Sequence, residues 1–366
     1  MELKKHSQTV TASISKYLIM SSFLNTKPAA SAAEERIVQL HRQFEHPAAN
    51  MPNTKSVHVP HLGGIDAAYQ MPTSYDASKP TMVLVNSFNT SSELYKSQFA
   101  NEKLTEKMNL IAIELLGHGQ TRTKAEHCEY SLVIRGLICK WKQRWLMWNL
   151  SAVTYWDTAI MNVQVLEKLG MCGDGKKVFV LGTSQGGWIT ISGIIPLGTS
   201  MDYESERTRK LGCWDAPTGL TPTINACTTN SATPDFEPGD DYCNFLIDTG
   251  FGKDCAAEAR RYWISEIKAN YKHDEGRRRL RMAAINLKER DGLHSRLFDV
   301  KCPVLWLHGT SDVVYSAENA REEIALFVNS PDAKLKVIEN GQHFLSFSHP
   351  KEVDEALLEF VGRYGK

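Results

Sequence analysis

The nine residues VFVLGTSQG at 178–186 decide the fold. The first four are apolar and predict a strand that is buried on both faces of a parallel sheet. This strand runs directly into GTSQG (182–186), a G-x-S-x-G pattern. After a buried strand, such a pattern makes a tight strand-to-helix turn that raises the serine hydroxyl above the sheet. The pattern alone could be a glycine-rich turn without chemistry, but the preceding strand favours Ser184 as a nucleophile.

Two turns further along the chain carry the partners that a nucleophilic serine requires. The segment LHGTSD (307–312) ends in Asp312, and the turn NGQHF (340–344) carries His343. A neutral hydroxyl is a weak nucleophile and needs a base that takes its proton. We expect His343 to be this base and Asp312 to orient its imidazole ring. Both follow predicted strands, and the carboxyl ends of parallel strands meet at one edge of a sheet.

Four other titratable residues near these turns have simpler interpretations. His308 lies on the strand that leads to the acid and is expected to be structural. His349 precedes a proline at a helix start and is expected at the surface, and Asp332 is expected in a turn. His118 is expected to order the loop that follows the second buried strand.

Two backbone N–H groups should face the negative charge that develops during acyl transfer. One belongs to Gln185, the residue after the nucleophile. The other should come from the loop NSFNT (86–90) after the first buried strand, where Phe88 is the candidate. For Asn89 and Thr90 an ordinary polar loop is an equally good interpretation.

Apolar runs and helical periodicities alternate along the chain and predict an α/β fold, with a mostly parallel sheet covered by helices on both faces. A hairpin is expected to precede the buried strands. The predicted strands are 56–59, 65–69, 81–86, 110–114, 178–181, 193–197, 304–308 and 335–338, and the predicted helices are 32–46, 156–169, 317–327 and 353–364.

A polar stretch interrupts this alternation and divides the chain into regions. Residues 202–292 contain clusters of Pro, Asn, Asp and Thr, followed by the basic helix-like run 256–288, and predict a mostly helical inserted cap. The core should then comprise 32–201 and 293–366. Residues 1–31 are expected to be a disordered N-terminal extension.

Composition excludes several classes of function. Basic and acidic residues balance at 42 each, so nothing indicates a nucleic-acid or membrane-surface partner. We find no metal-ligand spacing, no phosphate-binding loop and no dinucleotide glycine pattern, and therefore expect no metal and no cofactor. The eight cysteines include no C-x-x-C pair and the N-terminus lacks a secretory core, which favours free thiols and a cytoplasmic location.

Six segments carry a resemblance to a known family. They are LVNSFNTSSELY (84–95), IELLGHGQTRT (113–123), TYWDTAIMNVQVLEKLG (154–170), LGTSQGGW (181–188), IIPLGTSMDYESERTRKLGCWD (194–215) and LHGTSD (307–312). From about residue 55 onward the chain resembles the α/β-hydrolase superfamily, and in particular fungal α/β-hydrolases of specialised-metabolite gene clusters. The resemblance implies a hydrolase core with a helical cap and no cofactor, but names no substrate. Many members carry His-Gly where this chain has Asn86-Ser87.

The chain departs from this family in two places. Residues 129–153 are an atypical insertion with three tryptophans among basic residues, which we interpret as a retained intron rather than as an amphipathic membrane helix. Only nine residues, 185–193, separate Ser184 from the next strand. A parallel crossover with its helix needs about 10–12 residues, so a truncated or irregular segment is expected at 186–193.

These observations predict a serine hydrolase that cleaves an ester, thioester or lactone of a small molecule through an acyl-enzyme. Trp214 and Tyr242 of the cap are candidate walls of the acyl or alcohol pocket. The alternative is a catalytically dead or defective paralogue, because the helix after the nucleophile is shortened. A membrane-associated protein that uses 129–153 is a further alternative.

Overall fold

A computed structural model describes residues 53–123, 154–173, 175–189, 194–229 and 231–365. The N-terminal extension 1–31, the helix predicted at 32–46 and the insertion 129–153 lie outside the described residues. The described elements belong to one unit, Pro47–Lys366.

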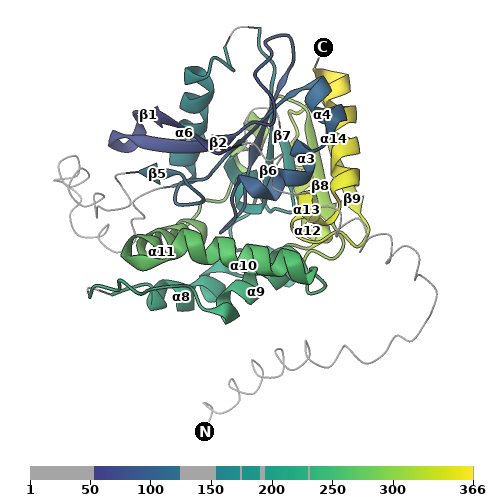
Figure 1. Ribbon diagram of the computed structural model, residues 1–366. Helices are drawn as coiled ribbons and strands as arrows, with labels where there is room; N and C mark the ends of the chain where they lie inside the picture. Colours follow the sequence, from purple (N-terminus) through teal and green to yellow (C-terminus); the bar gives the residue numbers. More distant parts are fainter. Residues whose placement is uncertain (1–52, 124–153, 174, 190–193, 230, 366) are drawn as a thin grey trace, which may run out of the picture. The chain divides into compact units, whose positions relative to one another are not determined.

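Nine strands of the described residues form one sheet in the order β1-β2-β4-β3-β6-β7-β8-β9, with β5 paired to β2 (Figure 1). Strands β1 and β2 form an antiparallel hairpin, β2 is antiparallel to β4, and the neighbours from β4 to β9 are parallel. The predicted hairpin and the mostly parallel sheet are therefore confirmed. The strands are β1 (Lys55–Val59), β2 (Ile65–Gln70), β3 (Thr81–Val85), β4 (Asn109–Ile113), β5 (Arg122–Thr123), β6 (Val178–Thr183), β7 (Ile194–Leu197), β8 (Val304–Gly309) and β9 (Ala333–Ile338).

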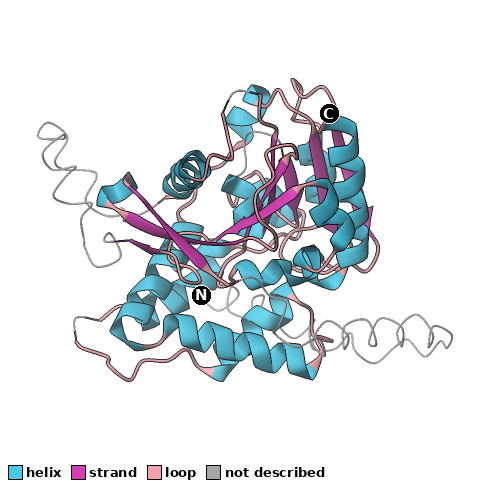
Figure 2. Cartoon of the chain, turned by 45° about the horizontal axis from the view of Figure 1, so that its top comes forward, coloured by secondary structure: helices cyan, strands magenta, loops and turns pink. Residues whose placement is uncertain are grey.

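Helices cover both faces of this sheet (Figure 2). Val83 of β3 belongs to an apolar cluster with Val165 of α6. Phe179 of the neighbouring strand β6 points to the other face of the sheet, because the side chains of a strand alternate between faces. Its ring lies 5.8 Å from that of Phe360 of α14. Full burial of such a side chain contributes about 1.5–3 kcal/mol, which explains the continuous apolar runs. The flanking helices are α3 (Lys96–Phe99), α4 (Glu102–Lys107), α6 (Tyr155–Lys168), α12 (Ala317–Ile324), α13 (Leu345–Ser348) and α14 (Pro350–Tyr364).

Local capping accounts for where these helices begin. Thr154 and Asp157 exchange hydrogen bonds between side chain and backbone, a capping box that starts α6. Helix α14 begins at Pro350, earlier than the predicted 353, because proline suits the first helical turn. Helix α12 stops short of the predicted 327, and Phe327 instead lies 6.4 Å from the ring of the buried Trp306.

The described part of the stretch 202–292 is mostly helical, as predicted, and lies between β7 and β8 in the chain. Its helices pack on one another and lie beyond one end of the strands (Figure 1). They are α7 (Glu206–Lys210), α8 (Ala216–Ala226), α9 (Asp240–Gly250), α10 (Ala257–Tyr271) and α11 (His273–Lys288). The basic run 256–288, predicted as one helical stretch, is divided because His273 has a φ of 64°. This turn is held by the His273 N–H, which donates to Phe236 O at 2.7 Å.

A buried ion pair joins the two ends of this cap. Glu204 precedes the cap helices and Arg290 follows them, and their side chains are hydrogen-bonded at 2% and 1% exposure. Arg290 also donates to the Tyr315 hydroxyl at 3.1 Å and to Leu287 O at 2.8 Å. The cap is thereby attached to the loop that follows β8.

The segment after Ser184 contains no regular α-helix in its described part. Residues Ser184–Ile189 form a 3₁₀ helix, and 190–193 lie outside the described residues. Strand β7 then begins at Ile194. In its described part, the segment is therefore irregular in place of a full crossover helix, as expected from the nine residues between Ser184 and β7.

No helix in the described part of the chain is long and apolar enough to cross a membrane. The described cysteines, at positions 172, 213, 227, 243, 255 and 302, are free thiols. Burial raises the pKa of these thiols, so they are poor nucleophiles.

Candidate active site

Ser184 occupies a strained turn directly after β6. Its φ of 51° lies in the left-handed region, which costs a residue with a side chain about 1–3 kcal/mol. A Cβ on Gly182 would lie 2.2 Å from Gly186 O, and one on Gly186 would lie 2.3 Å from Val85 O. The Thr199 hydroxyl donates to Ser184 O at 2.9 Å and fixes the turn from the β7 side. Both glycines are therefore required for this serine conformation.

Asp312 and His343 form a buried pair. His343 Nδ1 lies 2.9 Å from Asp312 Oδ2, and the two side chains are 4% and 0% exposed. Asp312 Oδ1 accepts the N–H groups of Val314 and Tyr315 at 2.8 and 3.0 Å. Burial acts to raise the pKa of Asp312, but the charge and hydrogen bond of His343 outweigh it, and the net pKa is lowered. The carboxylate is thus kept ionised beside the imidazole.

Gly198, directly after β7, makes room for this pair. Its φ is 48°, and a Cβ there would lie 2.5 Å from His343 O and 3.0 Å from Asp312 Oδ2. Only glycine fits such a backbone conformation at such a close approach. Ser184 follows β6, Gly198 follows β7 and Asp312 follows β8, so the three residues come from the ends of three neighbouring strands.

The loop 86–90 lies against the serine turn. A Cβ on Gly186 would meet Asn86 O at 2.7 Å, so the two backbones touch. The Asn86 amide donates to Thr90 O at 2.7 Å and accepts the Leu115 N–H at 3.0 Å. Thr90 N–H closes a turn onto Ser87 O at 3.1 Å, and the half-buried Phe88 lies at the corner of this turn. Asn86 therefore orders this loop.

Ser184 and His343 open into one cavity between the core and the cap. The space, including its open mouth, measures about 780 Å³. The candidate residues Phe88, Trp214 and Tyr242 line it, whereas Gln185 is buried beside the serine. The other lining residues are Ser87, Asn89, Thr90, Gly219, Leu220, Thr223, Phe245, Leu246, Ile247, Thr249, Gly250, Phe251, Trp263, Ile267, Leu287, Val314, Tyr315 and Phe344.

Sequence reasoning did not identify most of this wall. Phe344 directly follows His343, and its position beside the histidine was a signal that could have been used. Phe251 and Trp263 come from the cap, and their rings lie 5.0 Å apart. Their inward orientation depends on how α9 and α10 pack, which no local pattern states.

Three further histidines of the described residues, His118, His308 and His349, are buried, and backbone contacts hold the first two of them. His118 is buried, its Nδ1 lies 2.8 Å from Leu116 O, and burial lowers its pKa to about 4. His308 is buried and contacts Tyr315 O at 2.8 Å. His349, expected at the surface, is buried instead, because the short helix α13 packs the chain into the core just before it.

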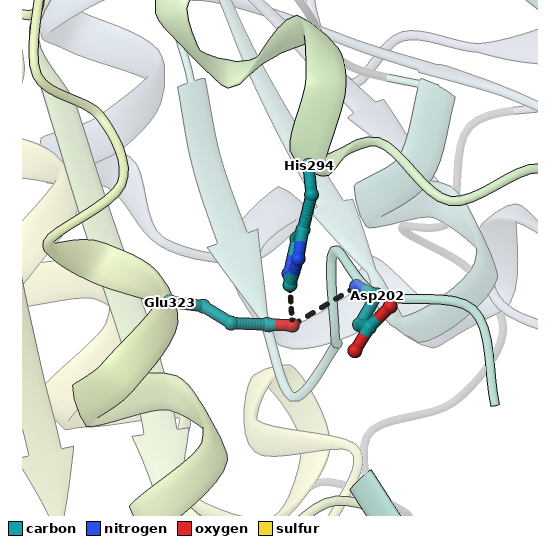
Figure 3. A group of neighbouring side chains, drawn as sticks. All are labelled: Asp202, His294 and Glu323. Atoms are coloured by element: carbon teal, nitrogen blue, oxygen red, sulfur yellow. Dashed lines mark hydrogen bonds and ion pairs between the residues drawn. The ribbon is translucent and has the colours of Figure 1, made fainter. Parts of the chain in front are cut away.

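Asp202, His294 and Glu323 form a group of potential metal ligands in the described part of the chain (Figure 3). Glu323 Oε1 accepts the Asp202 N–H at 2.9 Å and lies 2.9 Å from His294 Nε2. The guanidinium of Arg207 lies 2.9 Å from the same oxygen and 3.2 Å from Asp202 Oδ2. The guanidinium of Arg207 therefore already pairs with both carboxylates, and the group is an ion-pair network that binds α12 to the start of the cap.

The chain is similar in structure to an esterase from Thermogutta terrifontis (17% identity, 84% of this chain and 98% of that chain, TM-score 0.60). It is also similar to an esterase from Exiguobacterium antarcticum (16% identity, 84% of this chain and 100% of that chain, TM-score 0.61). An enol-lactonase from Burkholderia xenovorans is similar as well (14% identity, 84% of this chain and 100% of that chain, TM-score 0.59). At these identities the likeness establishes the fold alone. No curated protein matches the sequence. Residues 82–356 match the family described as the alpha/beta hydrolase family, and because this span is most of the chain, the protein belongs to that family of hydrolases.

Proposed function

We propose that the protein is a serine hydrolase that cleaves a small-molecule ester, thioester or lactone through an acyl-enzyme. The observation that carries this proposal is the strained Ser184, which opens into the same cavity as the buried Asp312–His343 pair. In this reaction Ser184 attacks the carbonyl carbon while His343 takes its proton. Asp312 stabilises the imidazolium that forms.

The tetrahedral intermediate needs donors for its oxygen. We assign the backbone N–H groups of Gln185 and Phe88, because the serine turn and the loop 86–90 are in backbone contact. His343 then gives its proton to the leaving group, and water releases the acyl group by the reverse sequence.

The substrate part of the proposal rests on the cavity and on resemblance. Trp214 and Tyr242 are assigned to the wall that holds the substrate. Two structurally similar proteins are an esterase and an enol-lactonase, which favours a carboxylic ester or lactone. The sequence resemblance further suggests a cytoplasmic enzyme of fungal specialised metabolism.

A second candidate, a defective paralogue, is favoured by one observation. A 3₁₀ helix follows Ser184 in place of a regular α-helix, whose N-terminus would help to stabilise an oxyanion. The two candidates make opposite predictions about the reactivity of Ser184.

A fluorophosphonate probe distinguishes them. We expect the purified protein to be labelled and to hydrolyse p-nitrophenyl esters, and the Ser184→Ala variant to do neither. Circular dichroism and thermal unfolding of both proteins provide the control for folding. A folded wild-type protein that resists the probe would establish the defective paralogue.

A further inference from the structure

The described wall of the cavity contains no side chain of Lys, Arg, Asp or Glu. His343 is the one imidazole among the described lining residues. An ion moved into such surroundings without a partner loses several kcal/mol of solvation, equivalent to a loss of at least about 100-fold in affinity. The part of the substrate that enters the cavity must therefore be uncharged.

Aromatic rings are concentrated beside the base. Phe251 lies at their centre, with ring centroids 5.0 Å from Trp263 and 4.9 Å from Phe344. The Phe344 ring in turn lies 5.2 Å from that of His343. Preformed aromatic walls of this kind favour a flat ring, because ring pairs gain energy beyond the area they bury.

One corner of the cavity is polar and incompletely satisfied. Ser87 and Asn89 are 1% and 3% exposed, yet Ser87 Oγ and Asn89 Oδ1 have no hydrogen-bond partner among the described residues. The Asn89 amide nitrogen donates to the Tyr242 hydroxyl at 2.5 Å. Burial raises the pKa of Tyr242 well above its usual value, so this hydroxyl stays protonated and can donate in turn. All three residues line the cavity next to Phe88.

Buried polar atoms without partners are rare in folded proteins and call for an explanation. Asn89 itself has a φ of 55°, so this corner also includes a strained backbone position. Here one acceptor, Asn89 Oδ1, and two hydroxyls that can donate, those of Ser87 and Tyr242, belong to the lining of a mostly apolar cavity. A hydroxyl group satisfies such a set, because it donates one hydrogen bond and accepts two. Rotation about the single side-chain torsion of Ser87 is enough to turn its oxygen toward a ligand.

We propose that the substrate is an uncharged aromatic ester or lactone that carries a hydroxyl group near the scissile carbonyl, bound by Ser87, Asn89 and Tyr242. The inference rests on the proposed function, since it places the carbonyl between Ser184 and Phe88. The aromatic ring lies against Phe251 and Phe344. The hydroxyl lies within a few bonds of the carbonyl, because Asn89 directly follows Phe88.

The test measures binding, so that it does not depend on turnover. Three esters are titrated by calorimetry into the Ser184→Ala variant: p-nitrophenyl phenylpropionate, its β-hydroxy analogue and its para-carboxy analogue. We expect the hydroxylated ester to bind about 10- to 100-fold more tightly than the plain ester, as in sites built around a substrate hydroxyl. The carboxylate should bind at least about 100-fold more weakly than the plain ester.

Matched variants locate the preference. In the Ser184→Ala background, Asn89→Gly removes the amide but tolerates the positive φ, and Tyr242→Phe removes only the hydroxyl. Both should abolish the preference for the hydroxylated ester, since the hydrogen bonds to its hydroxyl group are lost. Tyr203→Phe is the control, because its hydroxyl donates to Lys288 O outside the cavity lining.

The outcomes separate this inference from the proposed function. Equal affinities for the hydroxylated and plain esters overturn the inference, whatever the probe shows at Ser184. A preference that persists in both variants also overturns it. Fluorophosphonate labelling of the wild type, measured in parallel, tests the nucleophile alone.

Discussion

Replacement of Gly198 by alanine would place a methyl group against the Asp312–His343 pair. The new Cβ would lie 2.5 Å from His343 O, which is backbone and not the end of a flexible side chain. Ordinary van der Waals contact begins at 3.4 Å, so the two backbones must separate by about 0.9 Å. The substitution therefore shifts the proposed base without removing any reacting group.

A shift of this size has a calculable consequence for rate. A misplacement of about 1 Å at a catalytic group costs about 100-fold, because the reacting atoms leave their attack geometry. The φ of 48° adds backbone strain of about 1–2 kcal/mol for alanine. We expect Gly198→Ala to lower kcat/KM for a p-nitrophenyl ester about 100-fold and to slow fluorophosphonate labelling in parallel.

Gly170→Ala is the matched control. Gly170 has a φ of 65°, and a Cβ there meets no atom within 4 Å. This variant should lose about 1–2 kcal/mol in urea unfolding but keep its kcat/KM. If Gly198→Ala keeps wild-type kcat/KM, or if both variants lose activity equally, the contact does not position the base and our reasoning about His343 fails.

Three further changes test other parts of the structure. Asp312→Asn should lower kcat about 10⁴-fold in ester hydrolysis with little change in thermal unfolding, since the asparagine no longer holds the His343 tautomer. Glu204→Gln should cost about 3–5 kcal/mol in urea unfolding, because it leaves the Arg290 charge buried and unpaired, and a loss below 1 kcal/mol would contradict this. Burial raises the pKa of Asp354 to about 6, so its folded form favours the proton, and stability present below about pH 4 is lost as the pH rises through 6. Between about pH 4 and about pH 7, the free energy of unfolding of the wild type should therefore fall by up to about 3 kcal/mol relative to that of Asp354→Asn.

The sheet was predictable from sequence because its central strands are buried on both faces. Burial on both sides favours apolar residues, so β3 from Met82 and β4 from Leu110 appear as unbroken apolar runs. The serine turn was predictable for a different reason. Its glycines have no room for a Cβ, so the pattern around Ser184 records a backbone contact.

The cap interior was not predictable in the same way. The inward positions of Phe251 and Trp263 depend on packing between helices that lie apart in the chain. Trp214 and Tyr242 were named from composition alone, and nothing in the sequence linked Tyr242 to Asn89. The burial of His349 likewise follows from the position of α13, a short helix without a strong local signal.

The order of strands in the sheet also bears on how the protein behaves at high concentration. The path of paired strands ends in β1 on one side and β9 on the other, and an outermost strand can recruit a strand from another molecule. Lys55 of β1 is exposed, as are Lys334 and Lys336 of β9. A second molecule that paired in the same way would bring these ammonium groups together. Both margins of the sheet thus carry charges that oppose edge-to-edge aggregation.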